Sequence, residues 1–204
     1  MRSYGQFCAL ARALDVVGDR WTLLIVRELA ARPCRFRDLS DGLPGIAPNL
    51  LADRLRLLTA EGVITHDDAT ATYQLTDRGK GLGGALKALV RWGIPLMARG
   101  QGGDQSRAHW LALAISAIFE GTALDPAVRV QILAGTDEIE IAAHRHAIET
   151  RAGHVLSPDV TLQGPHELIL GTLAGEISLA AAEKAGLAIR GSRPALHRLI
   201  EVRR

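Results

Sequence analysis

The feature that most constrains the fold of this chain is a pair of short amphipathic segments joined by a turn, within residues 35–62. In each segment apolar residues recur at helical spacing, so each predicted helix has one side to bury. Residues 43–48 between them contain proline and glycine, which end the first helix and let the second begin at a new angle. Pro48 suits the first position of a helix, and Gly62 suits the position just after one. This stretch therefore predicts a helix-turn-helix.

The side of this hairpin that is expected to face solvent is polar and partly cationic. It comprises Arg35, Arg37, Pro48, Asn49, Asp53, Arg54 and Arg56. In DNA-binding helices, arginines contact phosphates and bases, while amides contact base edges in the major groove. The pattern therefore makes these residues candidates for binding double-stranded DNA. A plain helical hairpin with a solvated face would show the same pattern, so both interpretations stay open for this stretch alone.

Further elements are predicted on both sides of the hairpin. Apolar periodicity predicts two earlier helices, over residues 7–17 and 19–32, with Asp19 as the N-cap of the second. Alternating runs on either side of a polar turn, within residues 63–75, predict the β-hairpin of a winged helix. A last helix is predicted over residues 77–98, and its apolar side exceeds what so small a domain can bury. A second copy of the chain is therefore expected to cover it.

The motifs of this half resemble those of the HxlR family of bacterial winged-helix regulators. The similar sequences are residues 14–25, 27–29, 35–39, 43–46, 50–58, 61–64 and 73–79, together with Cys8. The resemblance implies a homodimer built by the first and last helices of the domain. Its two recognition helices would enter successive major grooves of an inverted-repeat operator.

Two features depart from the family pattern. Ala47 stands where a serine or threonine is usual, so the recognition helix lacks a hydroxyl that could cap it and contact phosphate, and DNA binding is expected to be weaker by about 1 kcal/mol. The wing is short and carries two aspartates that repel phosphate, which leaves Thr65 and His66 as its expected DNA contacts. Arg54 has a structural alternative, an ion pair with a carboxylate such as Asp38.

The chain has two cysteines, Cys8 and Cys34, and they form no metal-ligand pattern. Some members of the family sense oxidants or electrophiles with a cysteine at the position of Cys8, so the resemblance makes Cys8 a redox candidate. Only Arg12 is placed to lower the pKa of its thiol, and a buried structural cysteine is the favoured interpretation. Cys34 is expected to be inert.

A Gly-rich polar stretch at residues 100–106 separates two expected domains, residues 1–100 and residues 106–204. The second half begins with an amphipathic helix and continues with four period-2 runs, then with helices around one more strand. This order predicts an α+β domain in which helices cover one face of a mostly antiparallel sheet.

The last hundred residues resemble the sterol-carrier-protein fold in residues 157–164, 173–178 and 187–192, followed by Leu196 and Leu199. The resemblance implies an apolar cavity for a small hydrophobic ligand. The candidate lining residues are Leu113, Ala117, Phe119, Leu170, Leu173 and Leu179. The same side chains could equally form an ordinary closed core.

No catalytic, cofactor or metal site is expected. The chain has no nucleophile elbow, phosphate-binding loop or paired-carboxylate motif, and His144 and His146 lack a third ligand. It also lacks an apolar run of membrane-spanning length and a secretory signal, which predicts a cytoplasmic protein. The expected function is that of a homodimeric, DNA-binding transcriptional regulator responsive to a hydrophobic ligand. The alternatives are a ligand carrier or interaction protein whose winged helix only dimerises, and a regulator controlled by oxidation of Cys8.

Overall fold

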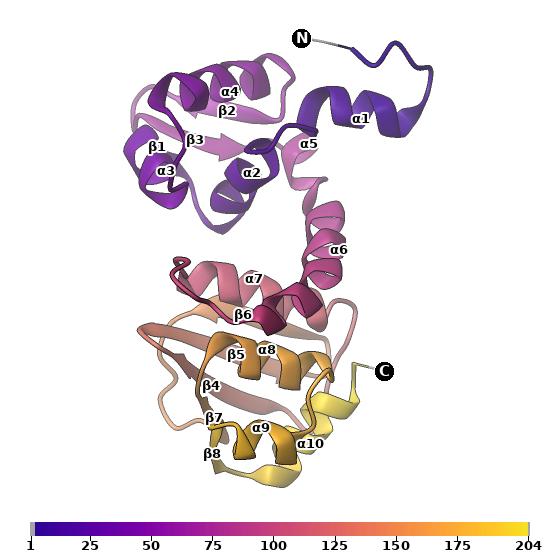
Figure 1. Cartoon of the computed structure of the whole chain (residues 1–204), viewed down its shortest axis with the longest axis vertical. Coiled ribbons are helices and arrows are strands. Elements are labelled where there is room, and N and C mark those ends of the chain that lie inside the picture. Colours follow the sequence, from indigo (N-terminus) through magenta and orange to yellow (C-terminus); the bar gives the residue numbers. More distant parts are fainter. Residues whose placement is uncertain (1–2, 204) are drawn as a thin grey trace. The chain divides into compact units, whose positions relative to one another are not determined.

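The computed structural model describes residues 3–203 and divides into two compact units, Met1–Leu86 and Lys87–Arg204 (Figure 1). The division lies before the Gly-rich stretch at residues 100–106, where the sequence placed the domain boundary. The physical reason is that residues just after Leu86 are held by the second unit. The Nζ atom of Lys87 lies 3.4 Å from one carboxylate oxygen of Glu120, and Arg91 lies 2.6 Å from the other.

Four helices form most of the first unit. They are α1 (Ala9–Val17), α2 (Thr22–Ala31), α3 (Phe36–Gly42) and α4 (Pro48–Ala60). The core is built by α2, α3 and α4, on which Ile25, Leu39 and Leu51 are fully buried, whereas α1 buries only Ala11. The turn between α3 and α4 contains Gly45 at a positive φ of 87°, a conformation that glycine adopts without steric cost. The predicted helix-turn-helix is confirmed.

A small antiparallel sheet completes the winged helix. Strands β2 (Ile64–Asp67) and β3 (Thr72–Leu75) form the predicted hairpin, and Gly62 before it has a φ of +67°. A two-residue strand that the sequence did not predict, β1 (Cys34–Arg35), pairs with β3 and gives the order β1-β3-β2. Because β1 lies between α2 and α3, this pairing ties the helix-turn-helix to the wing.

The single helix predicted over residues 77–98 is wrong. The segment instead forms α5 (Asp77–Lys80), α6 (Gly83–Gly93) and the 3-10 helix η1 (Ile94–Arg99). Thr76 caps α5, since its hydroxyl accepts a hydrogen bond from the backbone N–H of Gly79 at 3.2 Å. The glycines that follow lower helix propensity enough to end α5 after one turn, although the leucine periodicity continues.

The second unit is an α+β fold, as predicted. Its sheet consists of β4 (Val128–Ala134), β5 (Asp137–His144), β6 (Ala147–Ala152), β7 (Val160–Gln163) and β8 (Ala188–Gly191), in the order β6-β5-β4-β7-β8. Only β4 and β7 are parallel, so the sheet is mostly antiparallel. The helices are α7 (Ala108–Ile118), α8 (His166–Ala174), α9 (Leu179–Lys184) and α10 (Arg193–Glu201), with α7 and α8 lying against the sheet (Figure 1).

The candidate ligand-lining residues lie on the helix side of this sheet. Ala117, Phe119, Leu170 and Leu173 are at most 1% exposed, while Leu113 and Leu179 are half-buried. Phe119, Leu170 and Leu173 pack in the same continuous core as the isoleucines of β4 and β5. These three side chains are packed in a core, and the sterol-carrier-like cavity with its six lining residues stays a prediction. Among residues 3–203, no helix combines the length and the apolar character that crossing a membrane requires.

Candidate nucleic-acid interface

Helix α4 has one buried side and one free side. Leu51, Leu55 and Leu58 are at most 1% exposed and hold the helix against the core. The side chains that the sequence placed on the opposite side, namely Pro48, Asn49, Asp53 and Arg56, are all exposed. The predicted division of this helix into a core side and a solvent side is therefore confirmed.

The start of α4 lacks a side-chain cap. Ala47 occupies the N-cap position with an extended backbone and no hydrogen bond from its side chain, and Pro48 begins the helix. The first backbone N–H groups of a helix have no partner within the helix, so an external acceptor can reach them at this end.

Arg56 is paired with Asp53, one turn earlier on the same exposed side of α4. The side chains are 77% and 57% exposed, respectively, so the pair contributes no more than about 1 kcal/mol. A negatively charged partner with higher charge density can therefore attract Arg56 away from Asp53.

Arg54 has a different environment from Arg56. Its side chain is only 29% exposed, and its Nε atom lies 2.8 Å from a carboxylate oxygen of Asp19, the residue that precedes helix α2. The structural alternative for Arg54 is therefore present, but with Asp19 and not with Asp38. Asp38 accepts a hydrogen bond from the backbone N–H of Arg35 instead. One of its carboxylate oxygens lies 3.7 Å from a guanidinium nitrogen of Arg32.

Asp19 also holds the start of helix α2. Its carboxylate accepts hydrogen bonds from the backbone N–H groups of Trp21 and Thr22 at 2.7 and 3.2 Å, and from the Thr22 hydroxyl. The N-cap position of α2 is Trp21, so the prediction of Asp19 as the N-cap residue is wrong, although its carboxylate does accept from the N–H groups at the helix start. One carboxylate thus holds the first turn of α2 and contacts α4.

The arginines beside helix α3 are available to an external partner. Arg35 is exposed, and Arg37 is 92% exposed with its guanidinium 3.8 Å from Asp41. Both therefore add positive charge at the helix-turn-helix.

The wing has an acidic tip. The Asp68 carboxylate is 99% exposed and lies 2.8 Å from Nδ1 of His66, whose ring packs on Tyr73 with a centroid distance of 4.6 Å. Hydrogen bonds from the Thr70 hydroxyl and the Ala69 backbone N–H hold the pKa of Asp67 below its usual value. Both expected wing contacts, Thr65 and His66, are exposed, although Nδ1 of His66 is already paired with Asp68.

The two cysteines differ in exposure. Cys8 is exposed at the start of α1, so the favoured interpretation of a buried structural cysteine is wrong for the single chain. Cys34 is buried beneath α2, and this burial raises the pKa of its thiol, which keeps it protonated and unreactive at neutral pH.

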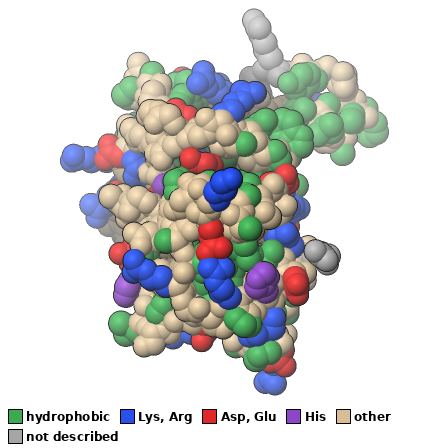
Figure 2. All heavy atoms as spheres, turned by 60° about the horizontal axis from the view of Figure 1, so that its bottom comes forward, with side chains coloured by type: hydrophobic (Ala, Val, Ile, Leu, Met, Phe, Trp, Pro, Cys, Tyr) green, Lys and Arg blue, Asp and Glu red, His purple; other side chains and the backbone are tan. Residues whose placement is uncertain are grey.

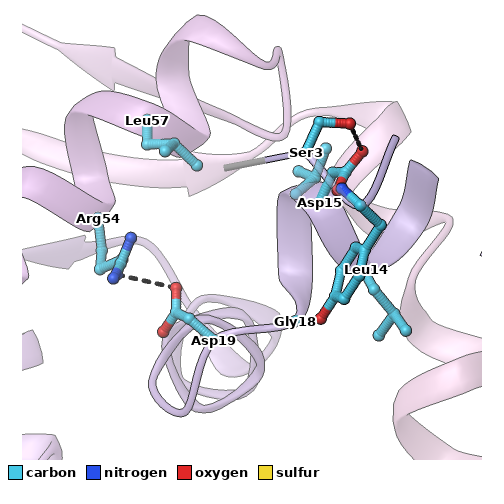
Figure 3. A pocket seen from close by; sticks show the side chains of 9 residues that line it. Ser3, Leu14, Asp15, Gly18, Asp19, Arg54 and Leu57 are labelled. Atoms are coloured by element: carbon cyan, nitrogen blue, oxygen red, sulfur yellow. Dashed lines mark hydrogen bonds and ion pairs between the residues drawn. The ribbon is translucent and has the colours of Figure 1, made fainter. Parts of the chain in front are cut away.

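A pocket that the sequence did not predict lies between α1 and α4, with a volume of about 450 Å³ (Figure 3). Its walls include Leu14, Asp15, Val16, Asp19, Arg54 and Leu57. These residues come from two segments far apart in the chain, residues 14–19 and 54–57, and only the fold brings them together. We call this space the α1–α4 pocket.

Large apolar side chains are exposed on α1 and α6. On α1 and just before it these are Phe7, Leu10 and Leu14, and on α6 they are Leu89 and Trp92. Figure 2 shows hydrophobic side chains gathered where α1 lies. A single chain therefore leaves uncovered the apolar sides that the sequence assigned to contacts with a second copy.

The family match covers most of the first unit and the first residues of the second. Residues 16–100 match the family model for the HxlR-like helix-turn-helix. The uncharacterised HTH-type transcriptional regulator YvaP of Bacillus subtilis is 35% identical over 86 residues, which make up 40% of this chain and 80% of YvaP. This chain belongs to the HxlR-like helix-turn-helix family.

Other similar proteins include the uncharacterised HTH-type transcriptional regulator Rv3095 of Mycobacterium tuberculosis. It is 37% identical over 99 residues, which make up 46% of this chain and 62% of Rv3095, so the chain spans less than two thirds of that relative. The quinone-bound structure of YodB from B. subtilis is 27% identical, covering 42% of this chain and 96% of YodB, with a TM-score of 0.39.

Proposed function

We propose that this member of the HxlR-like family is a homodimeric transcriptional regulator that binds double-stranded DNA through helix α4. The observation that carries the proposal is the free side of α4, where Asn49 and Arg56 are exposed beside an uncapped helix start. An arginine and an amide on one helix side supply the hydrogen-bond donors that base edges in the major groove accept. Phosphates are the natural acceptors for the first N–H groups of α4 and for Arg35 and Arg37.

The homodimer follows from the exposed apolar side chains of α1 and α6. Two copies would cover each other's Phe7, Leu10 and Trp92 and place two α4 helices on an inverted-repeat operator. In this arrangement Arg54 stabilises the position of α4 and does not contact bases, because its guanidinium is held beside Asp19. The acidic tip of the wing is expected to stay away from phosphate.

The second unit is proposed to bind a small hydrophobic effector. The support is its α+β fold with helices on one side of the sheet, which agrees with the sterol-carrier resemblance of its sequence. An effector with higher affinity for one dimer geometry would shift the DNA affinity by the ratio of its affinities for the two geometries.

The exposure of Cys8 favours a second candidate, a regulator controlled by thiol oxidation. Replacing Cys8 by serine distinguishes the two mechanisms. If the response of DNA binding to diamide is unchanged in Cys8→Ser, the redox mechanism is excluded.

Selection of genomic DNA fragments by the full chain tests the proposal, followed by gel shift on the enriched sequence. Arg56→Ala should weaken operator binding at least about tenfold, the usual effect of losing one arginine–base contact. The matched control is Arg190→Ala, an exposed arginine on β8, which should leave affinity unchanged. If no motif is enriched, the carrier or interaction protein becomes the better description.

A further inference from the structure

The α1–α4 pocket contains a partly buried arginine, Arg54, which is ion-paired with Asp19 but has unused hydrogen-bond donors. The guanidinium of Arg54, on the recognition helix, points into the pocket from one side, and Leu57 lies one turn away from it (Figure 3). Leu14 and Val16 come from α1. A space of about 450 Å³ is within the range of small-molecule sites in proteins.

The two carboxylates at the pocket already have partners. Asp15 accepts hydrogen bonds from the backbone N–H of Tyr4 at 2.9 Å and the Ser3 hydroxyl at 3.0 Å, and Arg12 lies 3.6 Å away. These contacts hold the pKa of Asp15 below its usual value, so its negative charge is compensated locally. Asp19 accepts its hydrogen bonds from the first turn of α2.

Arg54 is the group with unused hydrogen-bonding capacity. A guanidinium has five N–H donors. The Nε atom of Arg54 is buried, and although it lies 2.8 Å from Asp19, the angle does not make a hydrogen bond. Within residues 3–203, the guanidinium of Arg54 forms no hydrogen bond of good geometry. A buried donor without an acceptor destabilises the folded protein. A ligand that supplies an acceptor to Arg54 therefore gains more binding free energy than one that binds a group with all its hydrogen bonds made.

We propose that the α1–α4 pocket binds an organic carboxylate with an apolar body, and that this ligand regulates the recognition helix directly. The carboxylate would accept hydrogen bonds from Arg54, and the apolar body would pack between Leu14, Val16 and Leu57. A carboxylate suits this site because it can pair with the planar guanidinium of Arg54. Free phosphate or a hydrophilic acid would bind poorly because neither has an apolar body to pack against the leucines and valine.

The regulation follows from what Arg54 holds in the empty pocket. Its contact with Asp19 joins α4 to the start of α2. A ligand carboxylate competes with Asp19 for the same guanidinium, so binding weakens the contact that fixes α4. This step rests on the proposed DNA-binding function, whereas binding of the ligand itself does not.

The test uses 2-naphthoate as the probe and the uncharged 2-naphthamide as its isostere, measured by calorimetry with the full chain and no DNA. Naphthoate should bind saturably at sub-millimolar concentration, and naphthamide at least tenfold more weakly. Arg54→Gln should remove this preference for the anion, since a charge-assisted hydrogen bond changes affinity by about tenfold to a hundredfold. Leu57→Trp fills the pocket and should abolish binding with the arginine still present.

Arg56→Gln is the matched control, because Arg56 lies on the same helix but outside the pocket. It should keep the affinity for naphthoate while weakening DNA binding. Equal affinity of wild type and Arg54→Gln for naphthoate would overturn the proposal, and so would equal affinity of naphthoate and naphthamide.

The other candidate acceptor for Arg54 is a DNA phosphate. In that case naphthoate would not bind. Arg54→Gln would then reduce by about one the slope of the logarithm of DNA affinity against the logarithm of salt concentration. This result would overturn the ligand site and leave the DNA-binding function standing. If the chain binds naphthoate but enriches no DNA sequence, the ligand site stands and the proposed DNA-binding function is overturned.

Discussion

Replacing Asp19 by alanine should destabilise the winged helix by about 2–4 kcal/mol, mainly through the first turn of α2. The loss of the side-chain acceptor for the backbone N–H groups of Trp21 and Thr22 costs about 1 kcal/mol. Thr22 is fully buried, and its hydroxyl would lose its acceptor, which costs about 1–3 kcal/mol. The contact with Arg54 contributes less than about 1 kcal/mol, because both side chains are a quarter or more exposed.

Asp19→Asn separates these contributions. An asparagine keeps one oxygen, which can accept from the α2 backbone N–H groups, but it removes the second oxygen, which accepts from the Thr22 hydroxyl and faces Arg54. It should therefore cost less than Asp19→Ala by about 1 kcal/mol, the value of the retained backbone acceptor. The lost ion pair with Arg54 accounts for no more than about 1 kcal/mol of its cost. In a cycle with Arg54→Gln, the double mutant should reveal a coupling energy within the same limit.

Urea denaturation measures the free energy of unfolding of these variants. Because the chain has two compact units, hydrogen exchange of α2 peptides is needed to assign the loss to the first unit. Two results would refute the reasoning about Asp19. One is a cost of less than about 0.5 kcal/mol for Asp19→Ala, and the other is an equal cost for Asp19→Asn and Asp19→Ala.

Three further predictions concern the wing, the dimer and acid stability. Asp68→Lys places a cation at the fully exposed wing tip and frees His66, so gel shifts should show tighter DNA binding with steeper salt dependence. Trp92→Glu should shift the chain towards monomer in sedimentation velocity, since Trp92 is 74% exposed in the single chain. The hydrogen bond from Arg151 is the largest of the interactions that hold the pKa of Glu140 below its usual value. The stability that this carboxylate provides is therefore present at neutral pH and is lost as pH falls below about 4–5, so acid should destabilise wild type more than Glu140→Gln.

Patterns within single segments predicted most of the fold. The core side of α4, the wing and the sheet of the second unit follow from periodicities of 3.6 and 2 residues, which are local properties. The break between α5 and α6 was missed because the leucine spacing continues through Gly81 and Gly83. Strand β1 was missed because two residues carry no periodicity, and its pairing with β3 is a contact between distant segments.

The candidate site was predicted less completely than the fold. Exposure of Asn49 and Arg56 follows from their helical phase relative to the buried leucines. The partner of Arg54 could not be predicted, because Asp19 and Asp38 both precede α4 and only packing selects between them. The exposure of Cys8 likewise depends on how much of α1 the rest of the chain covers.

The charges around α4 bear on how tightly one subunit can hold DNA. Arg56 and Arg37 each lie near an aspartate on their own helix, and Arg54 is held by Asp19, so no arginine of these two helices is far from a carboxylate. DNA must displace each exposed pair at a cost of up to about 1 kcal/mol before a phosphate gains the arginine. One winged helix should therefore bind weakly. When two are joined, binding of the second half-site becomes intramolecular, so the affinity of the pair can exceed that of one subunit by about 10²–10⁴. In the proposed homodimer, the spacing of the two α4 helices would therefore control occupancy of the operator, and the proposed ligand would act by loosening the Arg54 contact that helps to position α4.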